Sequence, residues 1–164
     1  MKIRMIGWIV VLALALCGCA ARETFETLGD VPGGAEPAER RAVSLELPKE
    51  AASPVMDSER GQLYLCTDYE IGLQTLAAGD LNKTVQAVTG YGMDALTVMK
   101  TELEGLDRYD LVWTAAGENG QQMARAAILD DGNYHYVLTA QAAAEKAGEL
   151  HSTWNDIFES FGLD

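Results

Sequence analysis

Cysteine and histidine are scarce in this chain, and their scarcity excludes two kinds of site. Three cysteines in 164 residues cannot build a framework of disulfides, so we expect a packed apolar core to stabilise the fold. The two histidines, His135 and His151, are too far apart for an HExxH zinc motif, and paired CxxC motifs are missing. We therefore assign no metal site and no cofactor.

Basic residues are also few, which limits the partners that charge alone can attract. The chain has 12 Lys and Arg against 25 Asp and Glu, a formal net charge of −13. Such a surface repels a phosphate backbone and an anionic bilayer. We therefore expect no nucleic acid among its partners.

The motifs of several common enzymes are missing as well. There is no GxSxG nucleophile elbow, no phosphate-binding loop and no GxGxxG dinucleotide motif. The glycine-rich stretch "GYGMD" at 90–94 follows an expected helix, whereas a phosphate cradle precedes one. We interpret it as a helix stop and a loop, and we expect a protein that is not an enzyme.

The N-terminus has the proportions of an export signal. Lys2 and Arg4 form a positive segment, and Ile6 to Leu16 is apolar apart from Gly7. This apolar core is too short to cross ~30 Å of hydrocarbon, which takes about 20 helical residues. Residues 1–18 are therefore predicted to be a signal peptide.

The stretch "LCGC", from Leu16 to Cys19, resembles the lipobox of bacterial lipoproteins. The resemblance implies cleavage before Cys19 and attachment of diacylglycerol to its sulfur; Cys17 is the poorer candidate, because Leu16 is too bulky for the position before the cut. Two or more acyl chains anchor a protein where a single chain does not. This predicts a lipid anchor on the extracytoplasmic side of the cell membrane. The alternative is an ordinary secreted protein.

Processing changes both the cysteines and the charge. Cys17 leaves with the signal and Cys19 becomes a thioether, so Cys66 is the remaining thiol and an intramolecular disulfide cannot form. Cys66 lies in a strand-like run, where it is either a small buried hydrophobe or a reactive thiol. Loss of Lys2 and Arg4 takes the formal charge from −13 to −15, because residues 1–18 hold no acidic residue. The lipid, rather than charge, must hold the protein to its membrane.

Residues 20–41 have the composition of a flexible tether. They are rich in Gly, Pro, Ala and charge, and they lack a sustained apolar period, so they cannot bury enough surface to order themselves. The lipidated cysteine and the tether then occupy 19–41. The folded domain is expected over 42–164.

The expected order of elements is three strands, a helix, four strands and a second helix. Alternation of apolar and polar residues predicts strands at 42–48, 61–67, 69–76, 96–103, 108–115, 121–129 and 133–141. Asp80 begins and Gly90 ends a short helix, and 144–162 carries the stripe of a long amphipathic helix. We predict an α+β fold, in which the two helices cover an antiparallel sheet of about six to seven strands.

Two segments carry a resemblance to a known fold family. The hairpin "LDDGNYHYVLT" and the helix "WNDIFESFGL" resemble the corresponding parts of PsbP-like domains, and the resemblance covers residues 42–164. It implies an α/β/α sandwich, as in photosystem extrinsic subunits and many small bacterial lipoproteins. Members serve mainly as accessory, assembly or binding subunits, and the chain has no metal-ligand motif of the family.

Two turn signals divide the last three strands into two faces. Asn119-Gly120 and Asp131-Gly132 are pairs that a type I′ hairpin turn demands, and as two-residue loops they place Ile128 opposite His135 and Trp113 opposite Ala126. One face is then apolar: Leu111, Trp113, Ala115, Ala124, Ala126, Ile128, His135, Val137 and Thr139. The other is mixed: Asp110, Val112, Thr114, Met123, Arg125, Ala127, Tyr134, Tyr136 and Leu138. We expect the helix of Trp154 and Phe158 to pack on the apolar face.

His135 projects onto this apolar face, with Asp130 placed to accept its ring proton. We interpret it as a core histidine, since a metal would need a third ligand and acid–base catalysis would need a concave site. His151 lies on the polar side of the last helix and is expected to be solvated.

The mixed face offers the remaining candidate site. Arg125, Tyr136, Tyr134 and Thr114 are placed to line a ligand-binding groove, in which Arg125 offers a planar fork to an anionic group. In that case Arg125→Ala abolishes binding with little change in melting temperature. The alternative is structural: the same residues pack under a loop or under the first helix, with Arg125 paired to Asp110.

The sequence favours a non-catalytic, membrane-tethered module that binds a protein partner or a small ligand outside the cytoplasm. One alternative is a metal-binding envelope protein, motivated by Asp130 and His135. The other is an envelope hydrolase, which requires a deep pocket holding at least two titratable groups with opposed pKa shifts.

Overall fold

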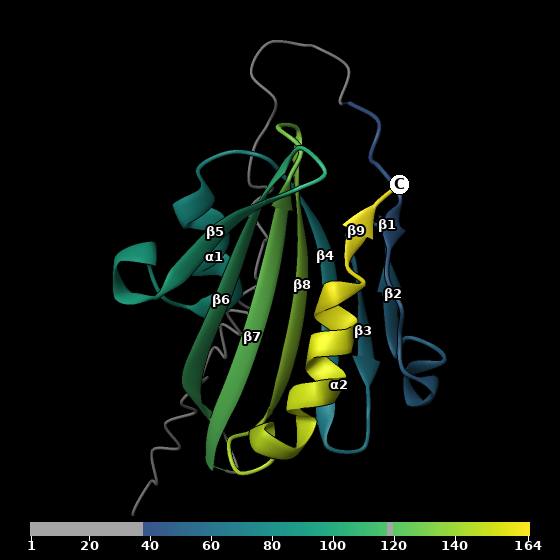
Figure 1. The fold of residues 1–164 in the computed structure, drawn as a ribbon, viewed down its shortest axis with the longest axis vertical. Helices are drawn as coiled ribbons and strands as arrows, with labels where there is room; N and C mark the ends of the chain where they lie inside the picture. Colours follow the sequence, from purple (N-terminus) through teal and green to yellow (C-terminus); the bar gives the residue numbers. More distant parts are fainter. Residues whose placement is uncertain (1–37, 118–119) are drawn as a thin grey trace, which may run out of the picture.

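The computed structural model describes residues 38–117 and 120–164, and in them seven antiparallel strands form one sheet. The order across the sheet is β2-β3-β4-β8-β7-β6-β5 (Figure 1). The strands are β2 (Met56–Ser58), β3 (Gly61–Leu65), β4 (Tyr69–Ala77), β5 (Val98–Leu103), β6 (Leu106–Gly117), β7 (Gly120–Asp130) and β8 (Tyr134–Ala143). Helices α1 (Leu81–Thr89) and α2 (Ala147–Glu159) pack on opposite sides of the sheet. The predicted α+β class and antiparallel sheet are confirmed.

The predicted strand at 42–48 does not join this sheet. It contributes β1 (Val43–Ser44), which pairs antiparallel with β9 (Gly162–Leu163) near the C-terminus. One edge of the main sheet is β2, which the sequence did not predict, and the other edge is β5. All three residues of β2 are exposed, so no apolar alternation marks it.

Helix α1 has the predicted boundaries. Asp80 Oδ1 accepts a hydrogen bond from the backbone N–H of Asn82 at 3.0 Å, as an N-cap does. Gly90 ends the helix with φ 79°, a left-handed conformation that glycine adopts without steric cost, and its N–H donates to the carbonyl of Gln86.

Helix α2 is shorter than the predicted stretch of 144–162. It ends at Glu159, after which Gly162 and Leu163 pair with β1 instead of continuing the helix. Phe161 is only 1% exposed although it lies beyond the helix end. The apolar stripe therefore continues beyond the last residue of the helix. For this reason the apolar periodicity placed the C-terminal end of α2 too late in the sequence.

Both hairpins of the last three strands differ from the predicted register by two residues. Ile128 pairs with Val137, and Trp113 pairs with Ala124. In the β7–β8 turn, Asp131 Oδ1 accepts from the N–H groups of Asn133 and Tyr134, which moves the centre of the turn one residue along, to Gly132 and Asn133. Since side chains alternate with a period of two, this even slip keeps every residue on its predicted face.

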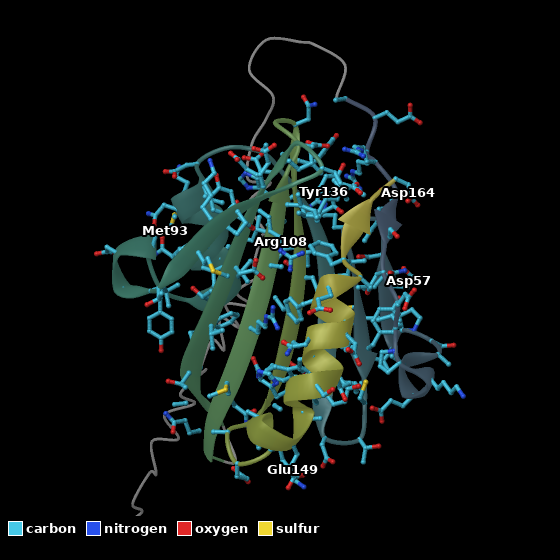
Figure 2. All side chains as sticks on the ribbon, in the orientation of Figure 1. Asp57, Met93, Arg108, Tyr136, Glu149 and Asp164 are labelled. Carbon is cyan, nitrogen blue, oxygen red and sulfur yellow. The ribbon has the colours of Figure 1, made fainter. Side chains whose placement is uncertain are left out.

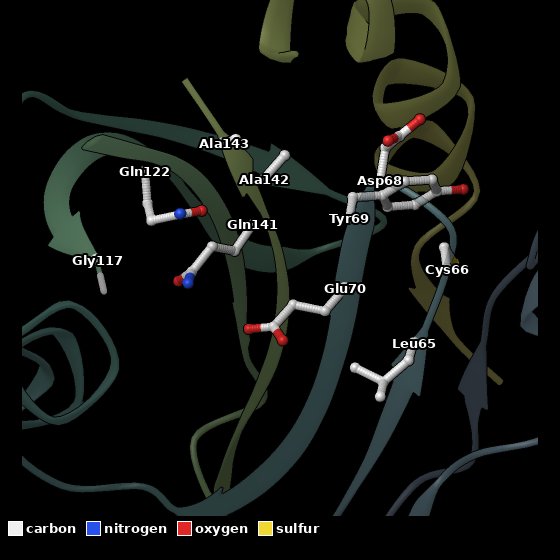
Figure 3. A pocket seen from close by; sticks show the side chains of 10 residues that line it. All are labelled: Leu65, Cys66, Asp68, Tyr69, Glu70, Gly117, Gln122, Gln141, Ala142 and Ala143. Carbon is white, nitrogen blue, oxygen red and sulfur yellow. The ribbon is translucent and has the colours of Figure 1, made fainter. Parts of the chain in front are cut away.

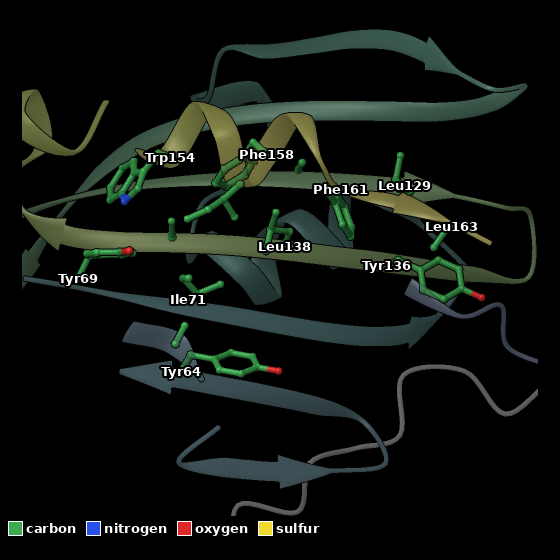
Figure 4. Close-up of a cluster of buried hydrophobic side chains, with 14 of the residues drawn as sticks. Tyr64, Tyr69, Ile71, Leu129, Tyr136, Leu138, Trp154, Phe158, Phe161 and Leu163 are labelled. Atoms are coloured by element: carbon green, nitrogen blue, oxygen red, sulfur yellow. The ribbon is translucent and has the colours of Figure 1, made fainter. Parts of the chain in front are cut away.

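The two faces carry the opposite helices from those predicted. The side of the sheet that packs with Val85 of α1 is called the α1 face, and it carries Leu111, Trp113, Ala124, Ala126, Ile128 and Val137. We call α2 face the side where Ile71, Ala127, Leu129, Tyr136 and Leu138 pack with Trp154, Ile157 and Phe158 of α2 (Figure 4). The prediction that Trp154 and Phe158 pack on the apolar face is therefore wrong. The tyrosines account for the error. Their rings are buried against α2, and only their hydroxyls reach the polar edge of the sheet. The face that the sequence indicated to be mixed is therefore apolar beneath α2.

None of the helices within 38–117 and 120–164 is both long enough and apolar enough to span a bilayer. The predicted signal at 1–18, the lipidated Cys19 and most of the tether lie outside the described residues.

Candidate functional site

Arg125 lies under α2 rather than in an open groove. Its Nη1 donates to Asn155 Oδ1 at 2.8 Å, and its guanidinium carbon lies 4.2 Å from the centre of the Phe158 ring. Its Nη2 lies 3.6 Å from Asp110 Oδ1. The structural alternative, with Arg125 paired to Asp110, therefore describes this residue, although the covering element is α2 and not the first helix.

Asp110 is held between two arginines at the foot of α2. Arg108 makes a bidentate contact with it, at 2.8 and 3.1 Å, and also donates to the backbone carbonyl of Phe158 at 3.0 Å. Arg108 thus satisfies a carbonyl in the last turn of α2, where cations are favoured. The Arg108–Asp110–Arg125 cluster, of which Figure 2 labels Arg108, fastens the helix to β6 and β7.

Tyr134 and Tyr136 bind the chain's own N-terminal segment. We call residues 38–44 the strap. The Tyr134 hydroxyl donates to the carbonyl of Ala38 at 2.8 Å, and the Tyr136 hydroxyl accepts from the N–H of Arg41 at 2.8 Å. The Tyr136 hydroxyl also donates to Asp131 Oδ2 at 3.1 Å. Both tyrosines are therefore occupied by Ala38 and Arg41, which are among the last residues of the predicted tether.

The C-terminus holds the same strap from its other side. The Arg41 guanidinium donates to the carbonyls of Leu163 and Asp164, at 3.0 and 3.2 Å. The N–H of Asp164 donates back to the carbonyl of Ala42 at 2.9 Å. Tyr136 and Asp164 lie at the same end of the molecule in Figure 2. The described chain therefore begins at this end of the domain, beside the β7–β8 turn.

Burial raises the pKa of Tyr136, and the carboxylate of Asp131 adds to the shift. The phenol therefore stays protonated at neutral pH and can donate its hydrogen bond to Asp131.

We expect Tyr136→Phe to loosen the strap without unfolding the domain. The change removes the hydrogen bonds to Arg41 and Asp131, which should favour opening of the strap by about 1–2 kcal/mol, or roughly 5–30-fold. Limited trypsin digestion after Arg41 measures this opening. In Tyr64→Phe, a matched control, the lost hydroxyl contacts Gln62 instead of the strap; equal digestion rates in the two variants would contradict the role given to Tyr136.

Thr114 is a diagonal neighbour of Arg125 on β6 and β7, but it lies apart from the two tyrosines. It is exposed on β6, where it pairs with Met123, and Met123 in turn pairs with Ala142 near the end of β8. Tyr134 begins β8 at its opposite end. The four residues predicted to line a groove therefore do not share one, because α2 covers part of the set and the length of β8 separates the rest.

His135 is the core histidine that the sequence predicted. It is 1% exposed, its Nδ1 lies 2.7 Å from the Thr84 hydroxyl of α1, and its Nε2 lies 3.5 Å from Asp130 Oδ2. Both ring nitrogens thus have a partner, and the imidazole links α1 to the end of β7. His151 is exposed on α2, as expected, and contacts Asn155.

Cys66 is a free thiol of intermediate exposure beside Tyr69. Burial raises the pKa of the Cys66 thiol, which favours an inert thiol over a reactive one. Burial also raises the pKa of Tyr69, and the nearby Glu50 carboxylate raises it further. Of the two alternatives for Cys66, these surroundings favour the small, partly buried hydrophobic side chain.

A shallow depression that the sequence did not reveal lies on the α1 face, where α1 does not reach. It measures about 480 Å³, and Glu70, Gln122 and Gln141 extend toward it from three strands (Figure 3). Leu65, 54% exposed, and Gly117 border it. Glu70 and Gln141 face each other across β4 and β8. The site depends on this long-range pairing, so local periodicity had no means of finding it.

The depression offers polar side chains for hydrogen bonding. Its lining includes the carboxylates of Asp68 and Glu70 and the side-chain amides of Gln122 and Gln141, groups that donate to or accept from a polar partner. Within 38–117 and 120–164, no group of three or more His, Cys, Asp or Glu is arranged to hold a metal ion.

No model of a known protein family and no curated protein matches this chain. Solved structures do match. Cyanobacterial PsbP (CyanoP) from Synechocystis sp. PCC 6803 is 10% identical with a TM-score of 0.50, over 81% of this chain and 99% of that one. A crystal structure from Bacteroides thetaiotaomicron is 12% identical with a TM-score of 0.50, over 74% of this chain and 45% of that one. LpqN of Mycobacterium tuberculosis, described as involved in cell envelope biogenesis, is 14% identical with a TM-score of 0.48, over 79% and 87%.

The match to cyanobacterial PsbP spans nearly all of that protein and places this chain among PsbP-like folds. The resemblance predicted from the β7–β8 hairpin and the final helix is thereby confirmed for the fold. At 10% identity the likeness defines architecture, and function must be argued from this chain's own surfaces.

Proposed function

We propose that this protein is a lipid-anchored, non-catalytic binding module on the extracytoplasmic side of the cell membrane. Its strap fixes the end of the domain from which the tether leaves. Its depression, lined by Glu70, Gln122 and Gln141, receives a protein partner or a small polar ligand.

The roles of the polar side chains support a non-catalytic module. His135 is buried between Thr84 and Asp130, and Arg125 is stacked on Phe158. Tyr134 and Tyr136 hold the strap. The side chains best suited to catalysis or anion binding are thus engaged within the fold, whereas those of the depression remain available to a partner.

The placement of the strap relative to the depression carries the proposal. Strand β8 begins at Tyr134, which binds the strap, and Gln141 and Ala143 border the depression near its other end. Seven residues of extended chain separate Tyr134 from Gln141, or about 23 Å at about 3.3 Å per residue. The strap and the depression therefore lie at opposite ends of β8, so the strap leaves the depression uncovered for a partner.

Site-specific photo-crosslinking in intact cells tests the depression. A photoreactive amino acid at Gln122 is expected to give a discrete adduct, and Gln141→Lys in the same chain should reduce its yield about tenfold by filling the site with a long cation. The matched control places the photoreactive group at Gln86, an exposed residue of α1. Equal adducts from both positions, or an adduct unaffected by Gln141→Lys, would refute binding at the depression.

A further inference from the structure

Strand β5 is a free-standing edge of the main sheet within the described residues. Residues 99–102 are all exposed, and Met99 is 58% exposed although it is a large apolar side chain. The opposite edge, β2, has only three residues. A six-residue edge with unpaired backbone groups is the place where a sheet of this kind accepts another strand.

The two sides of β5 carry different chemistry. Lys100 pairs with Tyr109 of the α1 face, and Glu102 lies two residues further along on that same side. Met99 pairs with Asp110 and therefore lies on the α2 face, as do Thr101 and Leu103. The α1 side of the edge is thus charged with both signs, and the α2 side is apolar or uncharged.

A second copy that continues the sheet through β5 must pair antiparallel, about a two-fold axis perpendicular to the sheet. Each face then continues as the same face, so the axis passes through one residue that meets its own copy. An axis at Lys100 sets two lysines against each other, and an axis at Glu102 sets two glutamates against each other. Both arrangements are destabilising.

An axis at Thr101 removes this conflict. Lys100 then faces the second copy's Glu102, and the symmetry repeats the pair, which gives two attractive pairs on the α1 side. On the α2 side, Met99 faces Leu103 and Thr101 faces its own copy, both favourable cross-strand combinations. The sequence of β5 is therefore self-complementary in one register.

We propose that the chain forms an antiparallel β5–β5 homodimer centred on Thr101, with a continuous sheet across both copies. Val112 is 55% exposed and lies two residues after Asp110 on the same face of β6. Since Asp110 pairs with Met99, Val112 adds apolar surface beside Met99 on the α2 face. The pairing covers a small area, and the net charge of −13 on each chain opposes it. The dimer is accordingly weak and dissociates on dilution.

Exchange of the two charges tests the register. Sedimentation velocity of the full chain in neutrally buoyant detergent, with micelles in excess over chains, gives the dissociation constant. Lys100→Glu and Glu102→Lys are each expected to weaken the dimer about tenfold or more, because both attractive pairs become repulsive. The double variant restores attraction and should return to within about threefold of the parent.

The exchange also separates this contact from the internal pair of Lys100. Lys100 Nζ lies 2.7 Å from Asp107, and Lys100→Glu loses that contact in the single and the double variant alike. Glu102 stands opposite Asp107 across β5 and β6, so Glu102→Lys offers this carboxylate a new cation in the double variant. The Glu102→Lys single variant keeps Lys100 beside Asp107, so weakening of its dimer reports the contact between copies. A parent that is monomeric at every concentration, or a double variant as weak as the singles, would overturn the proposal.

A cysteine at the axis gives a second measurement. Thr101→Cys brings two thiols together at the axis, so mild oxidation should yield a disulfide-linked dimer. Thr97→Cys is the control, because its copies would lie about 26 Å apart at about 3.3 Å per residue. The parent chain controls for its own cysteines. Equal crosslinking of both variants would contradict the assigned register.

Discussion

Replacing Phe158 by alanine is expected to lower the free energy of unfolding by about 3–5 kcal/mol. The ring is fully buried under the last turn of α2, in one apolar cluster with Leu138, Tyr136 and Ile71. It is also the surface on which Arg125 stacks, so its loss leaves that guanidinium without its apolar support. Urea denaturation followed by tyrosine and tryptophan fluorescence measures the change.

Two further variants keep this result interpretable. Phe158→Leu retains an apolar side chain of similar reach and should cost about 1–2 kcal/mol, which gives a graded value if the alanine variant does not fold. Glu159→Ala changes the next residue of α2, which is exposed, and should move stability by less than about 0.5 kcal/mol. A loss below about 1 kcal/mol for Phe158→Ala would mean that α2 is not the element that closes the α2 face.

The elements that the sequence predicted best are those whose signals lie within a few residues of chain. Asp80 and Gly90 define α1 through hydrogen bonds to Asn82 and Gln86, both on the same helix. The hairpin of β3 and β4 falls where two alternating runs flank Thr67 and Asp68. Such contacts join residues only a few positions apart, so they can be predicted from a short stretch of sequence.

The hairpin register shows how a wrong detail can leave a right conclusion. The side chain of Asp131 caps two N–H groups and shifts the turn, which a reading of the Asp-Gly pair alone does not foresee. Since the slip is even, His135 still reaches the α1 face and Tyr136 the α2 face. A slip of one residue would have reversed both assignments.

The strap could not be predicted, because its partners are remote in sequence. Arg41 meets Leu163 and Asp164 across more than 120 residues, and Tyr136 meets Arg41 across 95. Nothing in the local pattern links these segments. The tyrosines and Arg125 were singled out because polar groups on a half-apolar face resemble a ligand site. The same chemistry also serves to fasten the strap and a helix to the sheet.

The second large effect concerns the N-terminus, where Cys19→Ala is expected to abolish lipid attachment. The thiol of Cys19 supplies the sulfur of the expected thioether, and alanine has no nucleophile to replace it. Labelling cells with a clickable palmitate analogue should then give no signal on the chain. The protein should also run larger, because the uncleaved form retains residues 1–18.

Cys17→Ala is the matched control, since it lies two residues away and should keep both label and cleavage. Cys66→Ala removes the one remaining cysteine and should leave the label intact. Loss of label in Cys17→Ala with retention in Cys19→Ala would move the anchor to Cys17. No label on the parent chain would remove the anchor altogether. The acyl chains would contribute about 0.8 kcal/mol per buried methylene. Cleavage removes the apolar segment with residues 1–18, and the loss of Lys2 and Arg4 takes the formal charge from −13 to −15, so neither an apolar segment nor charge would hold the mature chain to an anionic membrane. We therefore expect membrane attachment of the mature protein to depend on the Cys19 sulfur.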